Sequence, residues 1–203
     1  MEMTSLIEKL QSSFLTDLPG WDAQKKLSPG YNPSYREVSP DAMQASVLVL
    51  ISPVKGIPHL NFIKRASRYV DDKHKGQIGF AGGKIEEGET ELEAVIREVE
   101  EEIGVTEDRY TILGKISPLY VFVSNFLVHP FVAYANVPLD FILDPSEVDE
   151  LIQWPITSLQ EGVFRKEISS GNATMKNVPY YPLGKETLWG ATSMITAEFL
   201  EMV

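Results

Sequence analysis

Carboxylate side chains are concentrated between Glu86 and Glu102, a window that holds nine glutamates and one arginine, Arg97. The net charge of this window is −8, against −11 for all 203 residues. On a helix, acids four residues apart, such as Glu98 and Glu102, repel each other by roughly 0.2–0.5 kcal/mol. A divalent cation would remove that cost, because Mg²⁺ binds hard carboxylate oxygens. The run indicates either a solvated acidic face, the usual meaning of such a pattern, or a cradle for a metal ion.

The same stretch predicts a helix with defined ends. Thr90 and Glu93 fit a capping box, and Gly104 fits the left-handed position that follows a helix. The apolar residues recur at three- and four-residue steps and should face a core. They are Leu92, Val95, Ile96, Val99 and Ile103.

Three glutamates share another face of this predicted helix. Glu98, Glu101 and Glu102 lie three or four positions apart, so their carboxylates can converge on one ion. Hydrolysis of a phosphoanhydride depends mainly on positioning and on neutralising charge at the phosphoryl oxygens. A chain this acidic can bind an anionic diphosphate only by presenting a metal ion and local cations. A metal cradle on this helix would suit such a reaction, which the family resemblance described next implies.

The spacing of the fixed residues resembles a known family motif. Gly83 is followed after five residues by Glu89, and after seven more by the run 97–105, which reads REVEEEIGV. This is similar to the Nudix box, Gx5Ex7REUxEExGU with U apolar, at each defined position. The resemblance implies an α/β (α+β) fold, the Nudix α/β/α sandwich, in which helices flank a mixed β-sheet. It also implies a pyrophosphohydrolase with Mg²⁺ or Mn²⁺ as cofactor.

The family resemblance implies metal ligands at specific positions. Glu98 and Glu102 would be the principal ligands, and Glu101 a third that acts directly or through water. Gly83, which has no side chain, can offer its carbonyl oxygen to the same ion. The three glutamates are accordingly the candidate catalytic residues of the box.

Two further assignments concern support and proton transfer. Glu89 and Arg97 should form a salt link that fixes the loop to the helix. The general base is either a box glutamate or an acid from a later loop, for which Glu147 is the candidate and Asp149 and Glu150 are competitors. A solvated acidic loop is the alternative interpretation of residues 144–150.

Two segments outside the box are similar to the coenzyme A pyrophosphatase branch of the Nudix family. Residues 62–67 (FIKRAS) and 74–83 (HKGQIGFAGG) resemble the LLTxRS and HxGQxxFPGG elements, and residues 188–192 (LWGAT) resemble IWGxTA. The sequence departs from this pattern in two places: Ala81 stands where the branch usually has proline, and the spacer before Gly76 is about two residues longer.

The branch resemblance implies a nucleotide-derived substrate, with coenzyme A or a derivative favoured. Cleavage would give 3′,5′-ADP and 4′-phosphopantetheine. The candidate substrate-binding residues are Arg65, Ser67 and Arg68, which could meet phosphates, and His74 and Gln77 near the diphosphate.

Two rival functions stay open. One is a Nudix pyrophosphatase for ADP-ribose, a dinucleotide or another nucleoside diphosphate derivative, which the two departures favour. The other is a non-catalytic ligand-sensing domain. Such a domain should lack box glutamates or carry a DNA-binding segment, and neither feature is present in the sequence.

Composition excludes several classes of protein. A pI near 4.8 argues against a nucleic-acid partner, and no apolar run approaches the roughly 20 residues of a membrane span. The chain has no cysteine, which is compatible with a cytoplasmic location. We expect an N-terminal helix and extended arm over residues 1–42, packed on a Nudix domain over residues 43–203. A homodimer is one option for its assembly.

Local patterns predict the remaining elements. Pro130 in the strand 128–135 indicates an edge strand or a bulge. The C-terminal residues 189–203 should form an amphipathic helix. The other expectations are a helix at 4–17, strands at 45–51, 59–63, 77–80, 111–116, 119–123 and 151–154, a helical turn at 155–159, and a hairpin at 163–184.

Overall fold

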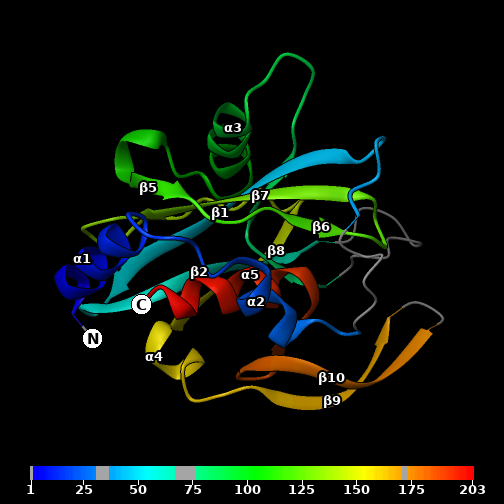
Figure 1. The fold of residues 1–203 in the computed structure, drawn as a ribbon. Helices are drawn as coiled ribbons and strands as arrows, with labels where there is room; N and C mark the ends of the chain where they lie inside the picture. The colour runs from blue at the N-terminus through cyan, green and yellow to red at the C-terminus, as the bar shows by residue number, and fades with distance from the viewer. Residues whose placement is uncertain (1, 31–36, 67–75, 171–172) are drawn as a thin grey trace.

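A mixed β-sheet lies between two layers of helices in this computed structural model, which describes residues 2–30, 37–66, 76–170 and 173–203 (Figure 1). Helix α3 (Glu91–Ile103) covers one face of the sheet, and α5 (Gly190–Glu201) with α2 (Gly20–Gln24) lies on the other face. The α/β/α sandwich expected from the sequence is therefore confirmed.

The central sheet has eight strands, five of which follow the order β3-β2-β1-β7-β5. Strand β1 pairs antiparallel with β2 and β4 and parallel with β7, so the sheet is mixed. Strand β8 pairs with β2, and β6 with β7. The bounds are β1 (Met43–Val54), β2 (Ile57–Arg65), β3 (Ile78–Gly79), β4 (Ala81–Lys84), β5 (Thr111–Lys115), β6 (Leu119–Val121), β7 (Phe126–Tyr134) and β8 (Val148–Pro155).

The other elements are short or lie at the ends of the chain. A second sheet of three strands packs beneath α5, in the order β11-β10-β9. Its bounds and those of the remaining helices are β9 (Phe164–Ser170), β10 (Ala173–Leu183), β11 (Glu186–Leu188), α1 (Met3–Ser13), η1 (Lys25–Leu27), η3 (Glu107–Arg109) and α4 (Ile156–Leu159).

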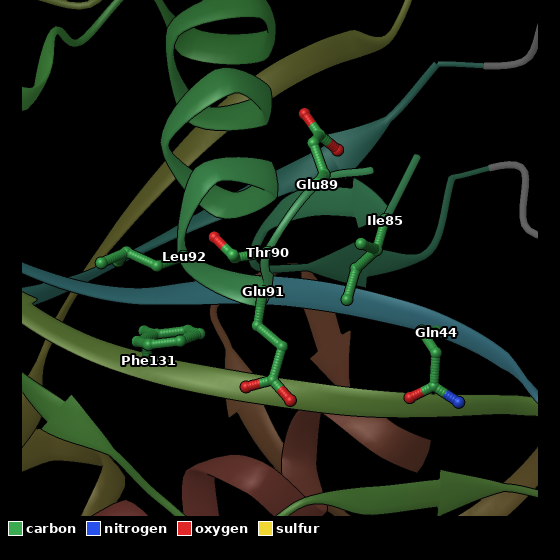
Figure 2. Close-up of a pocket in the computed structure, with 7 residues that line it drawn as sticks. All are labelled: Gln44, Ile85, Glu89, Thr90, Glu91, Leu92 and Phe131. Atoms are coloured by element: carbon green, nitrogen blue, oxygen red, sulfur yellow. The ribbon is translucent and has the colours of Figure 1, made fainter. Parts of the chain in front are cut away.

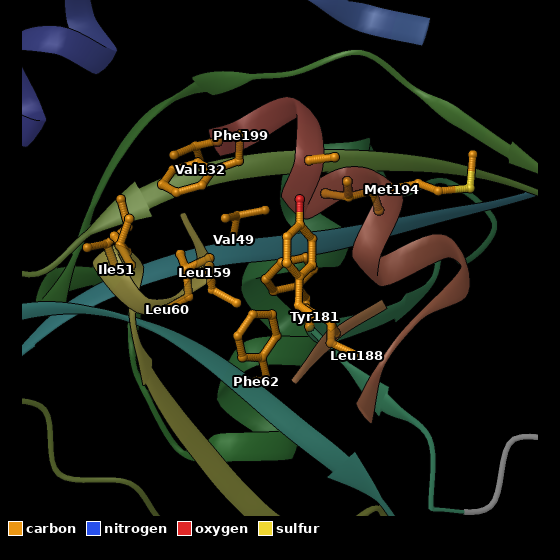
Figure 3. Packing of buried hydrophobic residues seen from close by; sticks show 14 of the residues in the cluster. Val49, Ile51, Leu60, Phe62, Val132, Leu159, Tyr181, Leu188, Met194 and Phe199 are labelled. Atoms are coloured by element: carbon orange, nitrogen blue, oxygen red, sulfur yellow. The ribbon is translucent and has the colours of Figure 1, made fainter. Parts of the chain in front are cut away.

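Both faces of β1 are buried, which explains its nearly continuous apolar sequence. Successive side chains of a strand point to opposite faces. Leu48 and Leu50 pack in the core beneath α3, whereas Val49 and Ile51 pack in the larger core beneath α5 (Figure 3). The sheet therefore separates two cores, and the smaller one holds α3 in place.

The ends of α3 agree with the sequence pattern. The Thr90 amide donates to Glu93 Oε2 (2.9 Å) and the Glu93 amide to Thr90 Oγ1 (3.2 Å), which completes the capping box. Gly104 adopts the left-handed conformation with a φ of 67°. Leu92 is an exception to the predicted apolar stripe, since it lies in the first turn and is 40 % exposed.

Two helices differ from the sequence expectation. The helix expected over 4–17 ends at Ser13, and α2 begins at Gly20 after a turn in which Leu15 is exposed. Helix α5 is buried on nearly all sides rather than amphipathic, because α2 and η1 pack on the side that would otherwise face solvent. Its interior sequence, residues 193–199, is buried throughout.

Pro130 lies in an interior strand, so the expected edge position was wrong. Strand β7 pairs with β1 on one side and with β5 and β6 on the other. The carbonyl of Pro130 accepts from the Ile116 amide (3.0 Å), in the segment that joins β5 to β6. The proline therefore falls at the break between two pairing partners, where its missing N–H removes no regular ladder bond.

A buried carboxylate joins the N-terminal helices to the rest of the fold. Glu198 on α5 is fully buried. Its Oε1 accepts from the Gly20 amide and the Ser117 amide, both at 3.1 Å, and its Oε2 accepts from Gln24 Nε2 at 2.7 Å. Leu6 and Leu10 of α1 are buried in the same core as α5. Along the described ranges, no helix combines the length and apolar character that a membrane crossing requires.

Replacing Glu198 by alanine should destabilise the protein by about 3 kcal/mol, because one buried and two partly buried donors would lose a charged acceptor. Urea unfolding followed by circular dichroism would measure the change. Glu201→Gln on the same helix is the control, since Glu201 is exposed and should shift stability by less than about 0.5 kcal/mol. Equal effects of the two variants would contradict a role for the buried hydrogen bonds.

Candidate active site and metal centre

Three glutamates converge at one end of α3. Glu98 and Glu102 come from the helix, and Glu147 comes from the turn before β8. One carboxylate oxygen of each lies within 4.8 Å of the others. Glu102 is buried and the other two are half-buried, so the group opens to solvent on one side. Three hard oxygen ligands at this separation can hold a divalent cation such as Mg²⁺ or Mn²⁺.

The Glu102 carboxylate is the deepest of the three, and only 1 % of its side chain is exposed. Its Oε2 accepts from the Gly82 amide (2.8 Å). Its Oε1 is buried without a hydrogen-bond partner among the described residues, and the guanidinium Nη1 of Arg65 lies 3.7 Å away. Burial raises the pKa of this carboxyl to about 7, against the opposing effects of the Gly82 amide and Arg65. A buried oxygen without a donor fits a metal ligand.

Glu98 lies against a glycine whose missing side chain leaves room for its carboxylate. A Cβ at Gly83 would come within 2.4 Å of the Glu98 carboxylate carbon and of Oε1. Burial raises the pKa of Glu98, while the neighbouring Arg97 acts in the opposite direction. The Gly83 backbone pairs with Ser46 of β1, which fixes this glycine beside the helix. The space beside Gly83 and the donor set of the three glutamates fit the expected metal ion.

Arg97 joins the helix to the loop before it. Its Nε and Nη2 donate to the two oxygens of Glu89 at 2.6 and 3.0 Å, and Nη2 also donates to the Lys84 carbonyl (3.3 Å). Its Nη1 donates to Glu98 (2.9 Å) and to Glu101 (3.0 Å). The hydrogen bonds that Arg97 donates to Glu89 lower the pKa of Glu89 to about 2 and raise the pKa of Arg97. The geometry agrees with the salt link expected from the sequence.

Glu101 and the competing acids lie outside the three-carboxylate group. The Glu101 carboxylate is 60 % exposed and bonds to Arg97 Nη1. Glu150 forms an ion pair with Lys185 (3.4 Å). Within the described part of the chain, the group includes Glu147 and neither Asp149 nor Glu150. Glu101 as a third ligand stays a prediction, which in this geometry requires a water molecule or a movement of its side chain.

The predicted substrate-binding residues are only partly described. Arg65 lies beside Glu102, with 41 % of its side chain exposed. Gln77 is placed next to it, because its carbonyl accepts from the Arg65 amide (3.0 Å). Ser67, Arg68 and His74 lie outside the described residues.

Sequence reasoning missed the donor that fixes Glu102. The amide of Gly82 points at Glu102 Oε2, and Gly82 has a φ of 143° with Ser46 O only 2.2 Å from where a Cβ would lie. A side chain is therefore excluded at this position. The paired glycines before the box were the available signal, but their sequence does not reveal which amide faces the helix.

A separate pocket lies at the other end of α3 (Figure 2). Its volume is about 520 Å³, and its lining residues are Gln44, Ile85, Glu89, Thr90, Glu91, Leu92 and Phe131. None of the three convergent glutamates lines it, so this pocket is not the metal centre.

Glu89→Gln should reduce stability in a pH-dependent way. The pKa of Glu89 falls from 4.5 to about 2 on folding, so its ionised form stabilises the folded state above pH 4.5. That stabilisation is lost as the pH falls toward 2. Urea midpoints of the wild type and the variant should differ most at pH 7 and converge as the pH is lowered to 3. A difference that stays constant over this range would contradict the Arg97 link.

Gly83→Ala should displace the Glu98 carboxylate and weaken Mn²⁺ binding by about tenfold, measured by electron paramagnetic resonance of free Mn²⁺. Gly79→Ala in the adjacent strand is the matched control, because a Cβ there meets nothing within 4 Å. Unchanged Mn²⁺ affinity in Gly83→Ala would argue against Glu98 as a ligand.

The chain is similar to known proteins in sequence and in fold. The mouse mitochondrial coenzyme A diphosphatase NUDT8 is 30 % identical over 166 residues, which cover 78 % of this chain and 77 % of that protein. The human mitochondrial coenzyme A diphosphatase NUDT8 is 30 % identical over 165 residues, covering 78 % and 69 %. The crystal structure of the MutT protein from Methanosarcina mazei Go1 superposes with a TM-score of 0.51 at 19 % identity, covering 80 % of this chain and 96 % of that one. A family profile described as NUDIX domain matches residues 42–175, more than half of the chain, which therefore belongs to the Nudix family of hydrolases.

Proposed function

We propose that this Nudix pyrophosphohydrolase uses Mg²⁺ or Mn²⁺ to cleave the diphosphate of coenzyme A or a derivative. The products would be 3′,5′-ADP and 4′-phosphopantetheine or its acyl form. The observation that carries the hydrolytic part is the buried Oε1 of Glu102, which has no hydrogen-bond partner among the described residues and lies within a group of three glutamates. The coenzyme A part rests on the motifs of residues 62–83 and 188–192, and on relatives named as coenzyme A diphosphatases.

Glu98 and Glu102 would be the principal ligands of the ion, with the Gly83 carbonyl as a further oxygen. Glu101 would contribute through water. A divalent ion bound there supplies positive charge for the diphosphate and a water molecule of lowered pKa. The protein would keep Glu98 in place through Arg97, which is itself fixed by two hydrogen bonds to Glu89.

Two residues facing this group have roles that do not depend on which diphosphate is bound. The Arg65 guanidinium, half-exposed beside Glu102, would donate to a phosphoryl oxygen and so orient the diphosphate. Glu147, which comes from the turn before β8, would accept a proton from the attacking water as general base. Ser67, Arg68, His74 and Gln77 complete the proposed substrate contacts.

The departures from the branch pattern affect the proposed specificity for coenzyme A. Ala81, which replaces the usual proline, is 4 % exposed and packs in the core beneath α3, where it pairs with Leu48. The substitution therefore changes a core position, and it reaches the substrate only through the glycines that follow. An ADP-ribose or dinucleotide pyrophosphatase is the alternative.

The cellular location and the oligomeric state stay predictions. We proposed a cytoplasmic protein, whereas the names of the mouse and human relatives place those proteins in mitochondria. A homodimer also stays a prediction.

Product analysis tests the proposal. Purified protein with Mg²⁺ or Mn²⁺ would be given coenzyme A, acetyl-coenzyme A, ADP-ribose, NADH, a diadenosine polyphosphate and nucleoside triphosphates. We expect 4′-phosphopantetheine and 3′,5′-ADP, or the acyl form, to appear faster than any other product by mass spectrometry. Preferential cleavage of ADP-ribose or a dinucleotide would overturn the coenzyme A assignment and leave the metal-dependent hydrolase intact.

Glu102→Gln should reduce kcat by at least about a hundredfold, because a neutral amide cannot replace a buried carboxylate ligand. The variant should be as stable as the wild type or more so above pH 7, since it removes a buried charge. Glu100→Gln is the matched control, because Glu100 is exposed on the same helix. Near-normal turnover in Glu102→Gln would contradict the metal assignment.

A further inference from the structure

An ion pair lies next to Arg65, at the end of strand β2. Lys64 Nζ, near the end of β2, lies 2.8 Å from Glu186 Oε1 in β11. Their side chains are 26 % and 19 % exposed, so the pair is shielded from solvent more than a typical surface pair. The hydrogen bond that Lys64 donates to Glu186 raises the pKa of Lys64. The pair thus joins the central sheet to the small sheet at the last residue before Arg65.

The two neighbouring residues face opposite sides of the sheet. Successive side chains of a strand alternate, so a fixed Lys64 determines the direction of Arg65. Phe62, two residues before Lys64, packs in the core beneath α5, and Ile63 packs in the core beneath α3. Arg65 accordingly reaches Glu102 on the α3 side, while Lys64 reaches β11 on the other side.

The regular ladder between β2 and β8 is interrupted at this point. Lys64 pairs with Glu150, whereas Arg65 pairs with Val148, so Asp149 is an extra residue on β8. Such a bulge bends the strand locally and is common next to active sites, where it redirects a side chain. Arg65 follows this bulge, where its amide donates to the Gln77 carbonyl and its carbonyl accepts from the Gly76 amide, and the ion pair of Lys64 adds a side-chain restraint at the same end of β2.

We infer that Lys64 and Glu186 are positioning residues for hydrolysis: their ion pair fixes the end of β2 so that the Arg65 guanidinium stays beside the three glutamates. This inference rests on the proposed function, in which Arg65 binds a phosphoryl oxygen of the substrate. The pair would act through Arg65 and not through the metal ligands, which come from β4 and α3. The exposed pair of Lys185 and Glu150 extends the same contact but is too solvated to replace it.

Steady-state kinetics of Glu186→Gln test the inference, with the best substrate from the product panel. We expect kcat/KM to fall about tenfold, mainly through a higher KM, because a displaced Arg65 weakens substrate binding. In an Arg65→Gln background the same change should alter kcat/KM by less than about twofold, since the residue through which it acts is already absent. Mn²⁺ affinity should not change in either background.

Glu201→Gln is the matched control, because it removes an ion pair between Glu201 and Lys26 at a site distant from the glutamates. Its kinetic constants should equal those of the wild type. Lys64→Gln is the second variant, and each protein would be assayed well below its own melting temperature. Kinetic constants of Glu186→Gln and Lys64→Gln equal to the wild type would overturn the inference. So would an undiminished effect in the Arg65→Gln background, or a parallel loss of Mn²⁺ affinity.

The product panel with the wild-type protein tests the proposed function separately from the positioning role of Lys64 and Glu186. Preferential hydrolysis of ADP-ribose by the wild type would overturn the coenzyme A assignment, and the positioning experiment would proceed with that substrate. Absence of hydrolysis across the whole panel would overturn both.

Discussion

The burial of the Glu102 carboxylate is the constraint on which the site depends. Removing a carboxylate from water is costly unless donors or cations replace the lost hydration, and here burial raises the pKa of Glu102 to about 7. One donor, the Gly82 amide, bonds to Oε2 of Glu102. At this point β4 lies so close to β1 that Gly82 has no room for a side chain. The tight β1–β4 pairing, the paired glycines and the docking of α3 are therefore parts of one arrangement. It leaves a buried oxygen of Glu102 beside two half-buried carboxylates, where a cation can replace the lost hydration.

Arg97 prevents the acidity of α3 from disrupting this arrangement. Its guanidinium bonds to Glu89, Glu98 and Glu101 together, so the repulsion between these carboxylates is offset while Glu102 is left without a direct contact to it. The arginine thereby stabilises the rim of the group and leaves the deepest carboxylate for a ligand. A lysine could not make the paired hydrogen bonds to Glu89 and also reach the helix face, because it lacks the planar fork of donors.

Much of α3 could be predicted from the sequence because its signals are local. The capping box, Gly104 and the spacing of Glu98 and Glu102 depend on residues close together in the chain, and the structure has them as expected. Helical periodicity could not show that the Gly82 amide would bond to Glu102, nor that the turn before β8 would bring Glu147 beside Glu98 and Glu102. Both depend on contacts between separate elements. The burial of residues 193–199 in α5 has the same origin, since α2 and η1 cover the side of the helix that would otherwise face solvent.

Two glutamates of this chain are almost fully buried, and their partners differ in a way that bears on function. Glu198 has donors at both oxygens, from two backbone amides and a glutamine side chain, so its charge is satisfied within the fold. Glu102 has one donor at Oε2 and, within the described residues, none at Oε1. Folding alone would favour the first arrangement, because an unpaired buried oxygen costs roughly 1–3 kcal/mol. The second arrangement is retained beside two other carboxylates, where a cation can supply the missing interaction. Of two buried acids, the one that the fold leaves unsatisfied is therefore the one expected to bind a ligand.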